Sequence, residues 1–428
     1  MTQQRQRRGG GRPQRPAPAA RDLTVGIREL GHKGDGIADT SPPIYVPRTL
    51  AGETARIRAT GTQAQLVAVE TGSPDRVEAP CPYFGTCGGC AVQHLAFDPY
   101  LAWKRDLVTA ALAARGLDVA VDPIVPAAPG TRRRAVLTAL PLGRTVMLGY
   151  HARSSHAIVD IESCLVLTPG LVERFGAFRD IARMMAPKKG PLRMTVTETD
   201  TGVDVAVEGG TEPDAARFAA LADIMDRARI ARVSLDGTAV MALAEPLVRI
   251  GRARVALPPG GFLQATAEAE EALAARVVAA LAGARRVADL FSGAGTFALR
   301  LAETASVVAV ESDRALLSAC VEAANRTDGL KALKGEARDL FTFPVSAKEL
   351  DRVDGLVFDP PRAGAADQAA EIAASKVGTV VAVSCNPATL ARDLRILVDG
   401  GYGIDSVVPV DQFLYAPHIE VVAVLTRR

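Results

Sequence analysis

The stretch Val383-Ser384-Cys385-Asn386-Pro387-Ala388-Thr389 marks the point where a strand ends and a helix begins. Residues 377–383 are small or β-branched, which predicts a buried strand, and Asn-Pro is a turn signal. Leucines at 390, 394 and 397 predict a helix that starts near Ala388. Cys385 is therefore expected at the carboxyl end of a strand, where open parallel α/β sheets bind ligands. It is either a nucleophile or an ordinary buried thiol, because free cysteine is among the most buried residue types.

The C-terminal part of the chain alternates between strand-like and helix-like patterns. Strands are expected over residues 286–291, 306–311, 330–334, 355–358, 377–384, 406–410 and 420–426, and the first long helix over residues 267–281. This alternation predicts an α/β fold with a doubly wound sheet and right-handed crossovers. No helix is expected between the last two strands, so they should pair antiparallel.

Three features at strand ends indicate a nucleotide-like ligand. The first strand runs into a glycine loop over residues 292–296, which lets the backbone approach the ligand closely. The next strand ends at Glu311, where a carboxylate can accept hydrogen bonds from two ribose hydroxyls. The loop lacks the G-x-G-x-x-G spacing of dinucleotide folds, which favours S-adenosylmethionine. Asp359 precedes two prolines at another strand end, as a ligand-facing carboxylate or as part of a proline-rich turn.

Cysteines are concentrated in one short segment. Cys81, Cys87 and Cys90 follow a C-x5-C-x2-C spacing with glycines between them, and Cys164 is the best candidate for a fourth ligand. Four thiolates suit either an iron–sulfur cluster or a structural zinc ion, and the three-plus-one arrangement favours the cluster. The N-terminus has no apolar signal-peptide region, so the chain is expected to be cytoplasmic, where cysteines serve metals or catalysis rather than disulfides.

A chain of 428 residues is expected to form two to four domains. Residues 1–21 form a tail rich in Arg, Gln, Gly and Pro, predicted to be disordered because it is too poor in apolar residues to order itself. Residues 22–72 contain short strands separated by Gly and Pro, which predicts a small β-barrel of the OB type. Residues 73–260 are expected to form an α+β domain that carries the cysteines, and residues 261–428 the ligand-binding sheet.

The overall charge restricts the possible partners. The formal net charge is only +2, so any nucleic-acid surface must be local. Arginines at 132, 133, 134, 144 and 153 form either a phosphate-binding face or a set of solvated side chains. No apolar run approaches membrane-spanning length, so no membrane association is expected. Nothing in the sequence indicates an obligate protein partner.

Three motifs resemble those of the RNA 5-methyluridine methyltransferases, the uracil-5 methyltransferases of ribosomal and transfer RNA. They are Asp359-Pro-Pro-Arg362-x-Gly364, Ser384-Cys385-Asn386-Pro387-x-Thr389-x-Ala391-Arg392-Asp393, and Gln412-Phe413…His418-x-Glu420. The resemblance extends over most of residues 23–428. Residues 30–38, followed by residues 45–47, resemble the TRAM domain of RNA-modifying enzymes. Together with the four cysteines, this is similar to the ribosomal branch that acts on 23S rRNA.

The resemblance implies a class I methyltransferase sheet and a covalent mechanism. Cys385 would add to C6 of uracil, and Glu420 would remove the proton from C5 after methyl transfer. The helix that begins near Ala388 should lower the pKa of the Cys385 thiol through its N-terminal dipole. The remaining implied site residues are Gln264, Phe291, Glu311 and Asp359 at S-adenosylmethionine, and Cys81, Cys87, Cys90 and Cys164 around a 4Fe–4S cluster.

The sequence also departs from the family pattern. Ser292 and Thr296 replace the usual Cys and Asn of the glycine loop, and Leu414 replaces the usual Pro. Three alternatives stay open. In the first, the substrate is transfer RNA. In the second, the enzyme methylates a nitrogen atom of the base, although such enzymes typically have an aromatic residue after the two prolines, where this chain has Arg362. In the third alternative, a non-catalytic RNA-binding assembly factor retains a methyltransferase scaffold.

Overall fold

The computed structural model describes residues 19–428, so most of the predicted tail lies outside the described residues. Arg21, the last residue of that predicted tail, is in fact the first residue of strand β1. The chain divides into two compact units between Val77 and Glu78, and each unit is considered by itself. Within residues 19–428, no helix is both long and apolar enough to cross a membrane.

The first unit contains a closed five-stranded barrel with strand order β1-β2-β3-β5-β4, which confirms the small β-barrel expected there. Its strands are β1 (Arg21–Leu30), β2 (Asp35–Ala38), β3 (Tyr45–Pro47), β4 (Thr54–Thr60) and β5 (Gln63–Thr71). Alternate residues of β4 point inward, and Ala55, Ile57 and Ala59 are fully buried. The sequence analysis did not identify β2, a short strand that begins at an Asp-Gly pair.

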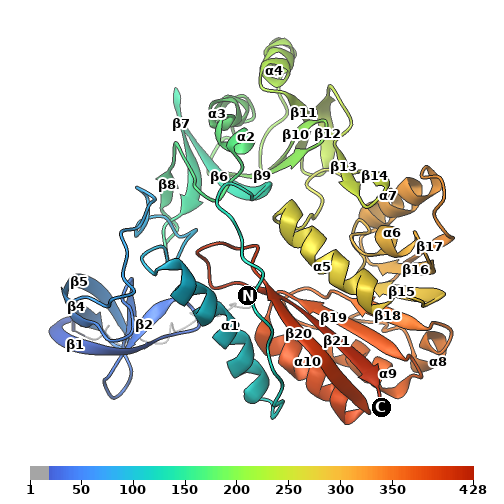
Figure 1. The fold of residues 1–428 in the computed structure, drawn as a ribbon. Helices are drawn as coiled ribbons and strands as arrows, with labels where there is room; N and C mark the ends of the chain where they lie inside the picture. Colours follow the sequence, from blue (N-terminus) through green and yellow to red (C-terminus); the bar gives the residue numbers. More distant parts are fainter. Residues whose placement is uncertain (1–18) are drawn as a thin grey trace, which may run out of the picture. The chain divides into compact units, whose positions relative to one another are not determined.

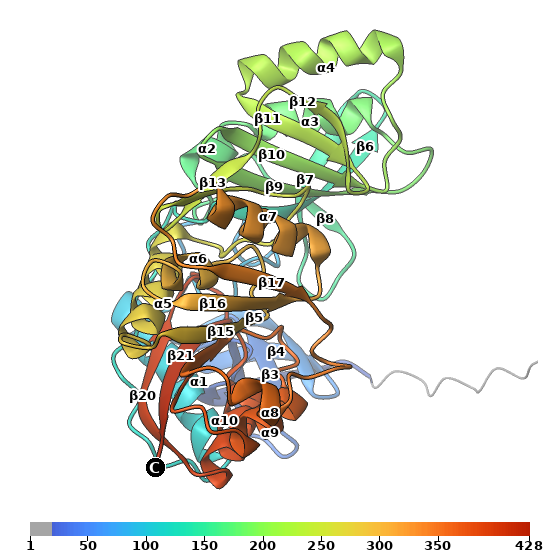
Figure 2. The same ribbon diagram turned by 90° about the vertical axis from the view of Figure 1, so that its right-hand side faces the viewer.

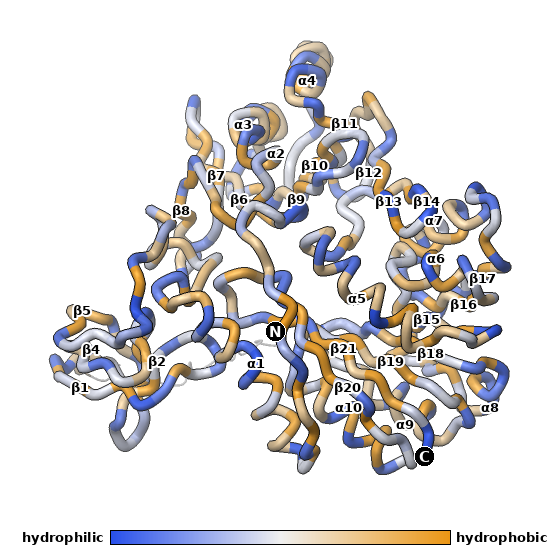
Figure 3. Tube along the Cα trace, in the orientation of Figure 1, coloured by the Kyte–Doolittle hydropathy of each residue, from blue (hydrophilic) through white to orange (hydrophobic). Residues whose placement is uncertain are grey.

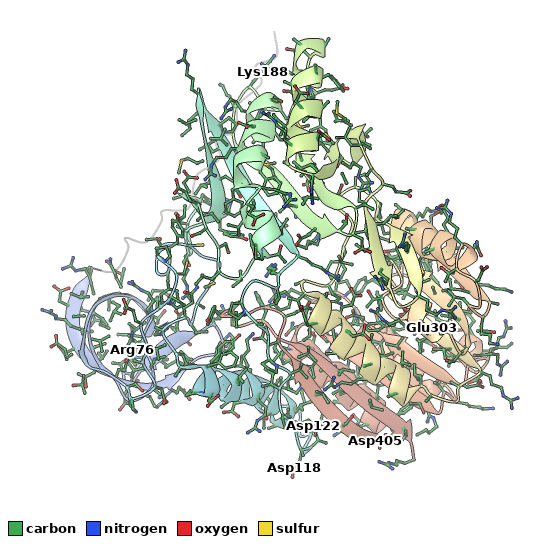
Figure 4. The ribbon with its side chains drawn as sticks, turned by 45° about the horizontal axis from the view of Figure 1, so that its top comes forward. Arg76, Asp118, Asp122, Lys188, Glu303 and Asp405 are labelled. Carbon is green, nitrogen blue, oxygen red and sulfur yellow. The ribbon has the colours of Figure 1, made fainter. Side chains whose placement is uncertain are left out.

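A buried carboxylate connects the barrel to the segment that follows it. Glu53 forms an ion pair with Arg76 at 2.5 Å and also accepts the backbone N–H groups of Leu50 and Ser73. Arg76, labelled in Figure 4, also donates to the carbonyl oxygen of Arg48 at 2.9 Å. Burial acts to raise the pKa of Glu53, but these hydrogen bonds and the arginine outweigh it, so the pKa is lowered. The side chains therefore hold residues 73–76 against the barrel.

The second unit contains a seven-stranded sheet of order β12-β11-β10-β9-β6-β7-β8. Its elements are β6 (Arg134–Leu142), β7 (Thr145–His151), β8 (Ile158–Asp160), α2 (Pro169–Val172), α3 (Phe175–Met184), β9 (Leu192–Thr199), β10 (Gly202–Glu208), α4 (Ala215–Arg227), β11 (Ile230–Leu235) and β12 (Thr238–Ala242). Helices α2 and α3 are separated by a backbone turn at Arg174, whose guanidinium donates to the carbonyl oxygens of Gly170 and Ala228.

The C-terminal sheet also has seven strands, in the order β17-β16-β15-β18-β19-β21-β20. Its elements are α5 (Ala267–Ala280), β15 (Arg286–Leu290), α6 (Ala298–Leu301), β16 (Ser306–Glu311), α7 (Arg314–Asn325), β17 (Leu333–Ala337), α8 (Ala347–Leu350), β18 (Gly355–Phe358), α9 (Ala366–Ala374), β19 (Thr379–Ser384), α10 (Pro387–Asp399), β20 (Tyr402–Val410) and β21 (Glu420–Arg427). Neighbouring strands from β17 to β19 are parallel, and β21 runs antiparallel to β20, as expected. On its other side β21 also runs antiparallel to β19.

One predicted strand is displaced. The pattern predicted residues 330–334, but β17 begins at Leu333 and contains Gly335. A Cβ atom at Gly335 would lie 2.7 Å from the side chain of Val321 on α7, so this glycine lets the helix pack directly on the strand. The strand was predicted from its apolar residues, and these do not indicate that α7 packs closely on a glycine of β17.

Both faces of the C-terminal sheet are covered, because its strands are apolar on both sides. In β19, Val381 and Val383 pack in the cluster with α5, α6 and α7, whereas Val380 and Ala382 pack in the cluster with α9 and α10. Figure 2 shows α7 above β15, β16 and β17, and α9 and α10 below them. Figure 3 shows β19 and β21 largely in the colours of apolar residues. This is the doubly wound arrangement that the sequence predicted.

Three segments expected in the central α+β domain pack on the C-terminal sheet or its helices. Helix α1 (Phe97–Ala113) places Val108 and Leu112 in the cluster with α9 and α10, and lies beside α10 in Figure 1. The segment after it follows β20, where Asp122, labelled in Figure 4, donates its backbone N–H to Val407 at 2.9 Å. The hairpin β13 (Leu247–Ile250) and β14 (Ala253–Ala256), which the sequence analysis missed, joins the opposite cluster.

Candidate active site

A cavity of about 410 Å³ lies at the carboxyl ends of β15, β16, β18 and β19. This volume is in the range of small-molecule sites, ~300–1,000 Å³. The six residues predicted for catalysis and for binding S-adenosylmethionine all line this cavity: Gln264, Phe291, Glu311, Asp359, Cys385 and Glu420. The fold thus brings together residues that are widely separated in the chain.

The glycine loop after β15 brings the backbone N–H of Gly293 to Glu311, the last residue of β16. Phe291, Gly293 and Gly295 all have positive φ angles, of 62°, 53° and 95°. The N–H of Gly293 donates to Oε2 of Glu311 at 2.9 Å, and Oε1 of Glu311 accepts the N–H of Asp313 at 2.8 Å. Both carboxylate oxygens of Glu311 are therefore held in place at the cavity. Positive φ at the non-glycine Phe291 is the kind of backbone strain that concentrates at functional sites.

The two residues that depart from the family pattern in this loop also reach the cavity. Ser292 and Thr296 both line it. Ser292 is 5% exposed, and its hydroxyl has no hydrogen-bond partner among the described residues. The hydroxyls are thus near enough to face a ligand where the family has Cys and Asn.

The loop with two prolines is connected to the start of α10 through Asn386. The side chain of Asn386 accepts the N–H of Ala388 at 3.2 Å, as a helix cap, and donates to the carbonyl oxygen of Arg362 at 2.9 Å. Thr389 donates its hydroxyl to the same carbonyl oxygen at 3.3 Å. Cys385 lies between β19 and this cap, so the turn that starts α10 also positions the thiol beside Asp359.

The electrostatic environment of Cys385 differs from the prediction. The pKa of its thiol is raised to about 12, first by burial and then by the carboxyl groups of Glu420 and Asp359. Arg362 acts in the opposite direction with a smaller effect. The expected lowering of this pKa is therefore wrong for this arrangement of side chains, because burial and two acidic neighbours outweigh the helix terminus.

Two carboxyl groups are buried in the wall of the cavity. Burial raises the pKa of Asp359, and the hydrogen bond from Gln264 at 3.3 Å opposes that shift. Burial also raises the pKa of Glu420, and the charge of Asp359 raises it further. The hydrogen bond from Gln412 acts in the opposite direction and lowers this pKa. A carboxyl group with a raised pKa holds its proton near neutral pH, which suits a group that exchanges protons with a substrate.

Gln412 belongs to the last of the three family motifs, but the sequence indicates no role for it. Its side chain is 2% exposed and contacts both Gln264 and Glu420. Asp411, beside it, accepts hydrogen bonds from Tyr100 at 2.5 Å and from Lys104 at 2.6 Å, and all three side chains are buried. No local pattern indicates these contacts, because α1 and the segment after β20 are far apart in the chain.

The four predicted metal ligands also come together. Cys81, Cys87, Cys90 and Cys164 line one cavity of about 180 Å³. The N–H of Gly89 donates to the sulfur of Cys87 at 3.4 Å. Over residues 19–428, no three His, Cys, Asp or Glu side chains are arranged so that they could hold a single metal ion. What the four cysteines share is the wall of this one cavity.

The predicted basic face is used in part within the protein. Arg133 forms an ion pair with Glu270 at 2.5 Å, and Arg134 donates to the carbonyl oxygens of Gly260 and Gly261. Arg132 lies over the ring of Phe413, 5.6 Å from its centroid, and lines the cysteine cavity. Arg133 and Arg134, at the start of β6, therefore hold the central sheet to α5 and to the segment before it, which is a structural role.

Comparison with known proteins supports what the fold and cavity indicate. The model of the family described as tRNA (Uracil-5-)-methyltransferase matches residues 222–428. An uncharacterized RNA methyltransferase of Brucella suis is 47% identical over 94% of this chain and 97% of its own length. The 23S rRNA (uracil(1939)-C(5))-methyltransferase RlmD of Chromohalobacter salexigens is 32% identical over 94% of this chain and 89% of its own length.

A solved structure agrees with these matches. The tRNA (uracil-54, C5)-methyltransferase of Pyrococcus abyssi, in complex with S-adenosyl-L-homocysteine, superposes with a TM-score of 0.74. It is 26% identical, and the match covers 94% of this chain and 99% of that protein.

The strand order and the cavity at the strand ends define a class I S-adenosylmethionine-dependent methyltransferase. More specifically, the chain belongs to the tRNA (uracil-5-)-methyltransferase family, and it is an RNA uracil-5 methyltransferase.

Proposed function

We propose that this enzyme methylates C5 of a uridine in 23S rRNA through a covalent bond between Cys385 and C6 of the base. The observation that carries the proposal is that the Cys385 thiol and the Glu420 carboxyl group line one cavity with the glycine loop. A nucleophile and a base on the same cavity are what uracil C5 methylation requires, because C5 alone is a poor nucleophile toward a methyl group.

The reaction divides into addition, transfer and elimination. The Cys385 sulfur bonds to C6, which makes C5 nucleophilic, and C5 then accepts the methyl group. Glu420 removes the C5 proton, the C5–C6 double bond re-forms, and the sulfur leaves with its electron pair. The Cys385 thiol must lose its proton before addition. Burial, together with the nearby carboxyl groups of Glu420 and Asp359, raises the pKa of this thiol and makes the step unfavourable. Positive charge in the cavity therefore favours addition.

S-adenosylmethionine supplies the electrophilic methyl group and carries that positive charge. We assign its binding to Gln264, Phe291, Glu311 and Asp359, which surround the glycine loop end of the cavity. The carboxylate of Glu311, held by the N–H of Gly293, is suited to accept ribose hydroxyls. Phe291 offers an aromatic wall and lies 5.5 Å from the ring of Phe341.

We assign a 4Fe–4S cluster to Cys81, Cys87, Cys90 and Cys164, because these thiols share one cavity. In this assignment the cluster holds the segment around Cys90 in place. The N–H groups of Ala91 and Val92 donate to the carbonyl oxygen of Tyr415, at 2.8 and 3.2 Å, so that segment contacts the loop before Glu420. The cysteines then act on the active site through structure.

The RNA substrate is supported by the relatives. We favour 23S rRNA because the RlmD relative matches 94% of this chain, and because the four cysteines and the barrel, which we assign as a TRAM domain, are similar to the ribosomal branch. Transfer RNA is the second candidate, favoured by the Pyrococcus abyssi structure. Either base must leave its stack to reach Cys385, which costs a few kcal/mol and least in loops. We expect the enzyme to act in the cytoplasm without an obligate protein partner.

The test uses RNA that contains 5-fluorouridine. Fluorine cannot be removed as a proton, so the native enzyme should form a stable protein–RNA adduct that migrates as a shifted band on a denaturing gel. Cys385→Ala should form none and should methylate no RNA, while still binding S-adenosylmethionine. Methyl transfer by Cys385→Ala at the wild-type rate would refute the covalent mechanism. Supplying 23S rRNA and transfer RNA transcripts separately and mapping the methylated uridine distinguishes the two substrates.

A further inference from the structure

Gln412 is the buried residue at the centre of the hydrogen bonds around the catalytic carboxyl groups. Its Oε1 accepts the backbone N–H of Ala265 at 2.7 Å. Its Nε2 donates to Oε1 of Gln264 at 2.7 Å and to Oε1 of Glu420 at 2.9 Å. Gln264 in turn donates to Asp359 at 3.3 Å. One amide thus connects the residues assigned to the cofactor with the residue assigned as base.

The orientation of the Gln412 amide follows from these contacts. A backbone N–H can only donate, so the atom that faces Ala265 must be the amide oxygen. The NH₂ group therefore faces Glu420. Because an amide nitrogen of this kind does not accept a proton, Oε1 of Glu420 must act as the acceptor and cannot carry a proton toward Gln412. The carboxyl proton is excluded from that oxygen as long as Gln412 is in place.

The other oxygen of Glu420 is in a different environment. Oε2 is buried and has no hydrogen-bond partner among the described residues. Glu420 itself is 5% exposed and lines the cavity that contains Cys385. An unpartnered buried oxygen on the wall of a substrate cavity is the atom that can receive a proton from the substrate.

We propose that Gln412 is a positioning residue that keeps Oε2 of Glu420 free to take the C5 proton. The inference rests on the proposed function, since it assigns the base role to Glu420. In the step concerned, the C5–H bond breaks and its proton goes to Oε2. The electron pair forms the C5–C6 double bond, and the bond between C6 and the Cys385 sulfur breaks, which releases the thiolate.

The backbone around Gln412 is held so that its side chain has little freedom. Asp411 is held by Tyr100 and Lys104 of α1, and the carbonyl oxygen of Phe413 accepts Lys104 Nζ at 3.1 Å. The N–H of Asp411 donates to Val125 at 2.8 Å. Both neighbours of Gln412 are thus fixed by α1 and by the segment after it. A residue that orients another side chain must itself be held in place in this way.

The test separates elimination from methyl transfer in the full-length enzyme. Gln412→Met keeps a similar volume and removes the donor. With saturating S-adenosylmethionine and RNA tritiated at uridine C5, this variant should transfer the methyl group in the first turnover and then release tritium slowly. The methylated covalent adduct should accumulate. Turnover should fall by about tenfold to a hundredfold, no more than the low end of the ~10²–10⁴ that a positioned base contributes, because Glu420 itself remains. The low-pH limb of the turnover profile should also move to higher pH.

Two controls make each outcome decisive. Glu420→Gln should trap the same methylated adduct, and its failure to do so would overturn the base assignment and with it the proposed function. Gln368→Met removes another buried glutamine, whose side chain bonds only the backbone of Val345 within residues 19–428, and should trap no adduct. If Glu420→Gln traps the adduct but Gln412→Met releases tritium at the wild-type rate, or slows methyl transfer without adduct, the role of Gln412 is overturned.

Discussion

Replacing Lys104 by Met should destabilise the methyltransferase unit strongly. Lys104 Nζ lies 2.6 Å from Oδ1 of Asp411, and both side chains are fully buried. Burial lowers the pKa of Lys104 to about 8, against the effect of Asp411, so this charge already lies in an unfavourable environment. Removing it leaves the carboxylate of Asp411 without its countercharge.

The magnitude follows from what remains around Asp411. Removing one partner of a buried ion pair costs about 3–5 kcal/mol. Asp411 would keep two hydrogen bonds, from the Tyr100 hydroxyl at 2.5 Å and from the Phe413 N–H at 2.9 Å. We therefore expect the lower end of that range, about 3 kcal/mol. Lys104→Met with Asp411→Asn should recover at least about 1 kcal/mol, because replacing both charges is often nearly neutral.

The assay is urea unfolding followed by the fluorescence of Trp103, the single tryptophan of the chain, which lies next to Lys104 on α1. Lys348→Met, an exposed substitution on α8, is the matched control and should stay within about 0.5 kcal/mol of the wild type. The reasoning is refuted if Lys104→Met loses less than about 1 kcal/mol, or if the double variant is no more stable than Lys104→Met.

Three further results are expected. Glu420→Gln should stabilise the protein at pH 8.5 but not at pH 4.5. The folded-state pKa of Glu420, about 8, exceeds the value of 4.5 for a free glutamate, so the wild type loses stability as the pH rises between these two values. Urea unfolding at a series of pH values measures this loss. Gly295→Ala should weaken S-adenosylmethionine binding about tenfold by titration, because overpacking costs about 1–3 kcal/mol and its Cβ would lie 2.5 Å from the sulfur of Cys320; Gly176→Ala on α3, with open space around its Cβ and no positive φ, should bind nearly normally. Cys164→Ser should abolish the visible absorption and iron content of anaerobically purified protein and should slow methyl transfer about tenfold or more, as small misplacements of catalytic groups do; an iron-free wild type with full activity would contradict it.

Much of the C-terminal fold was predictable because its signals are local. Strands β16 and β18 have the predicted bounds, and the residues after β18 and β19 lie at the cavity as expected. An apolar run followed by Gly, Asp or Asn-Pro encodes both a strand and the turn that ends it. Since parallel strands end at one edge of a sheet, the convergence of Glu311, Asp359 and Cys385 follows from the order of the elements.

Contacts between distant segments were not predictable in the same way. The N-terminal helix α1 packs on the C-terminal sheet, and Lys104 reaches Asp411 across 307 positions of the chain. Residue patterns indicate which face of a helix is apolar, but not which sheet covers that face. The division of residues 73–260 from residues 261–428 stays a prediction, and α1 shows that packing crosses that boundary.

The sequence by itself determined the class of sheet, the residues at its ligand-binding edge and the set of cysteines, because each is encoded by type and spacing over a few residues. Only the tertiary structure decided how those side chains are protonated and oriented. The thiol pKa of Cys385 depends on burial and on Glu420 and Asp359, and the orientation of Glu420 depends on Gln412, which also bonds Gln264 from 148 positions away. Charge and hydrogen bonding act through space, so they are set by the neighbours that folding brings together.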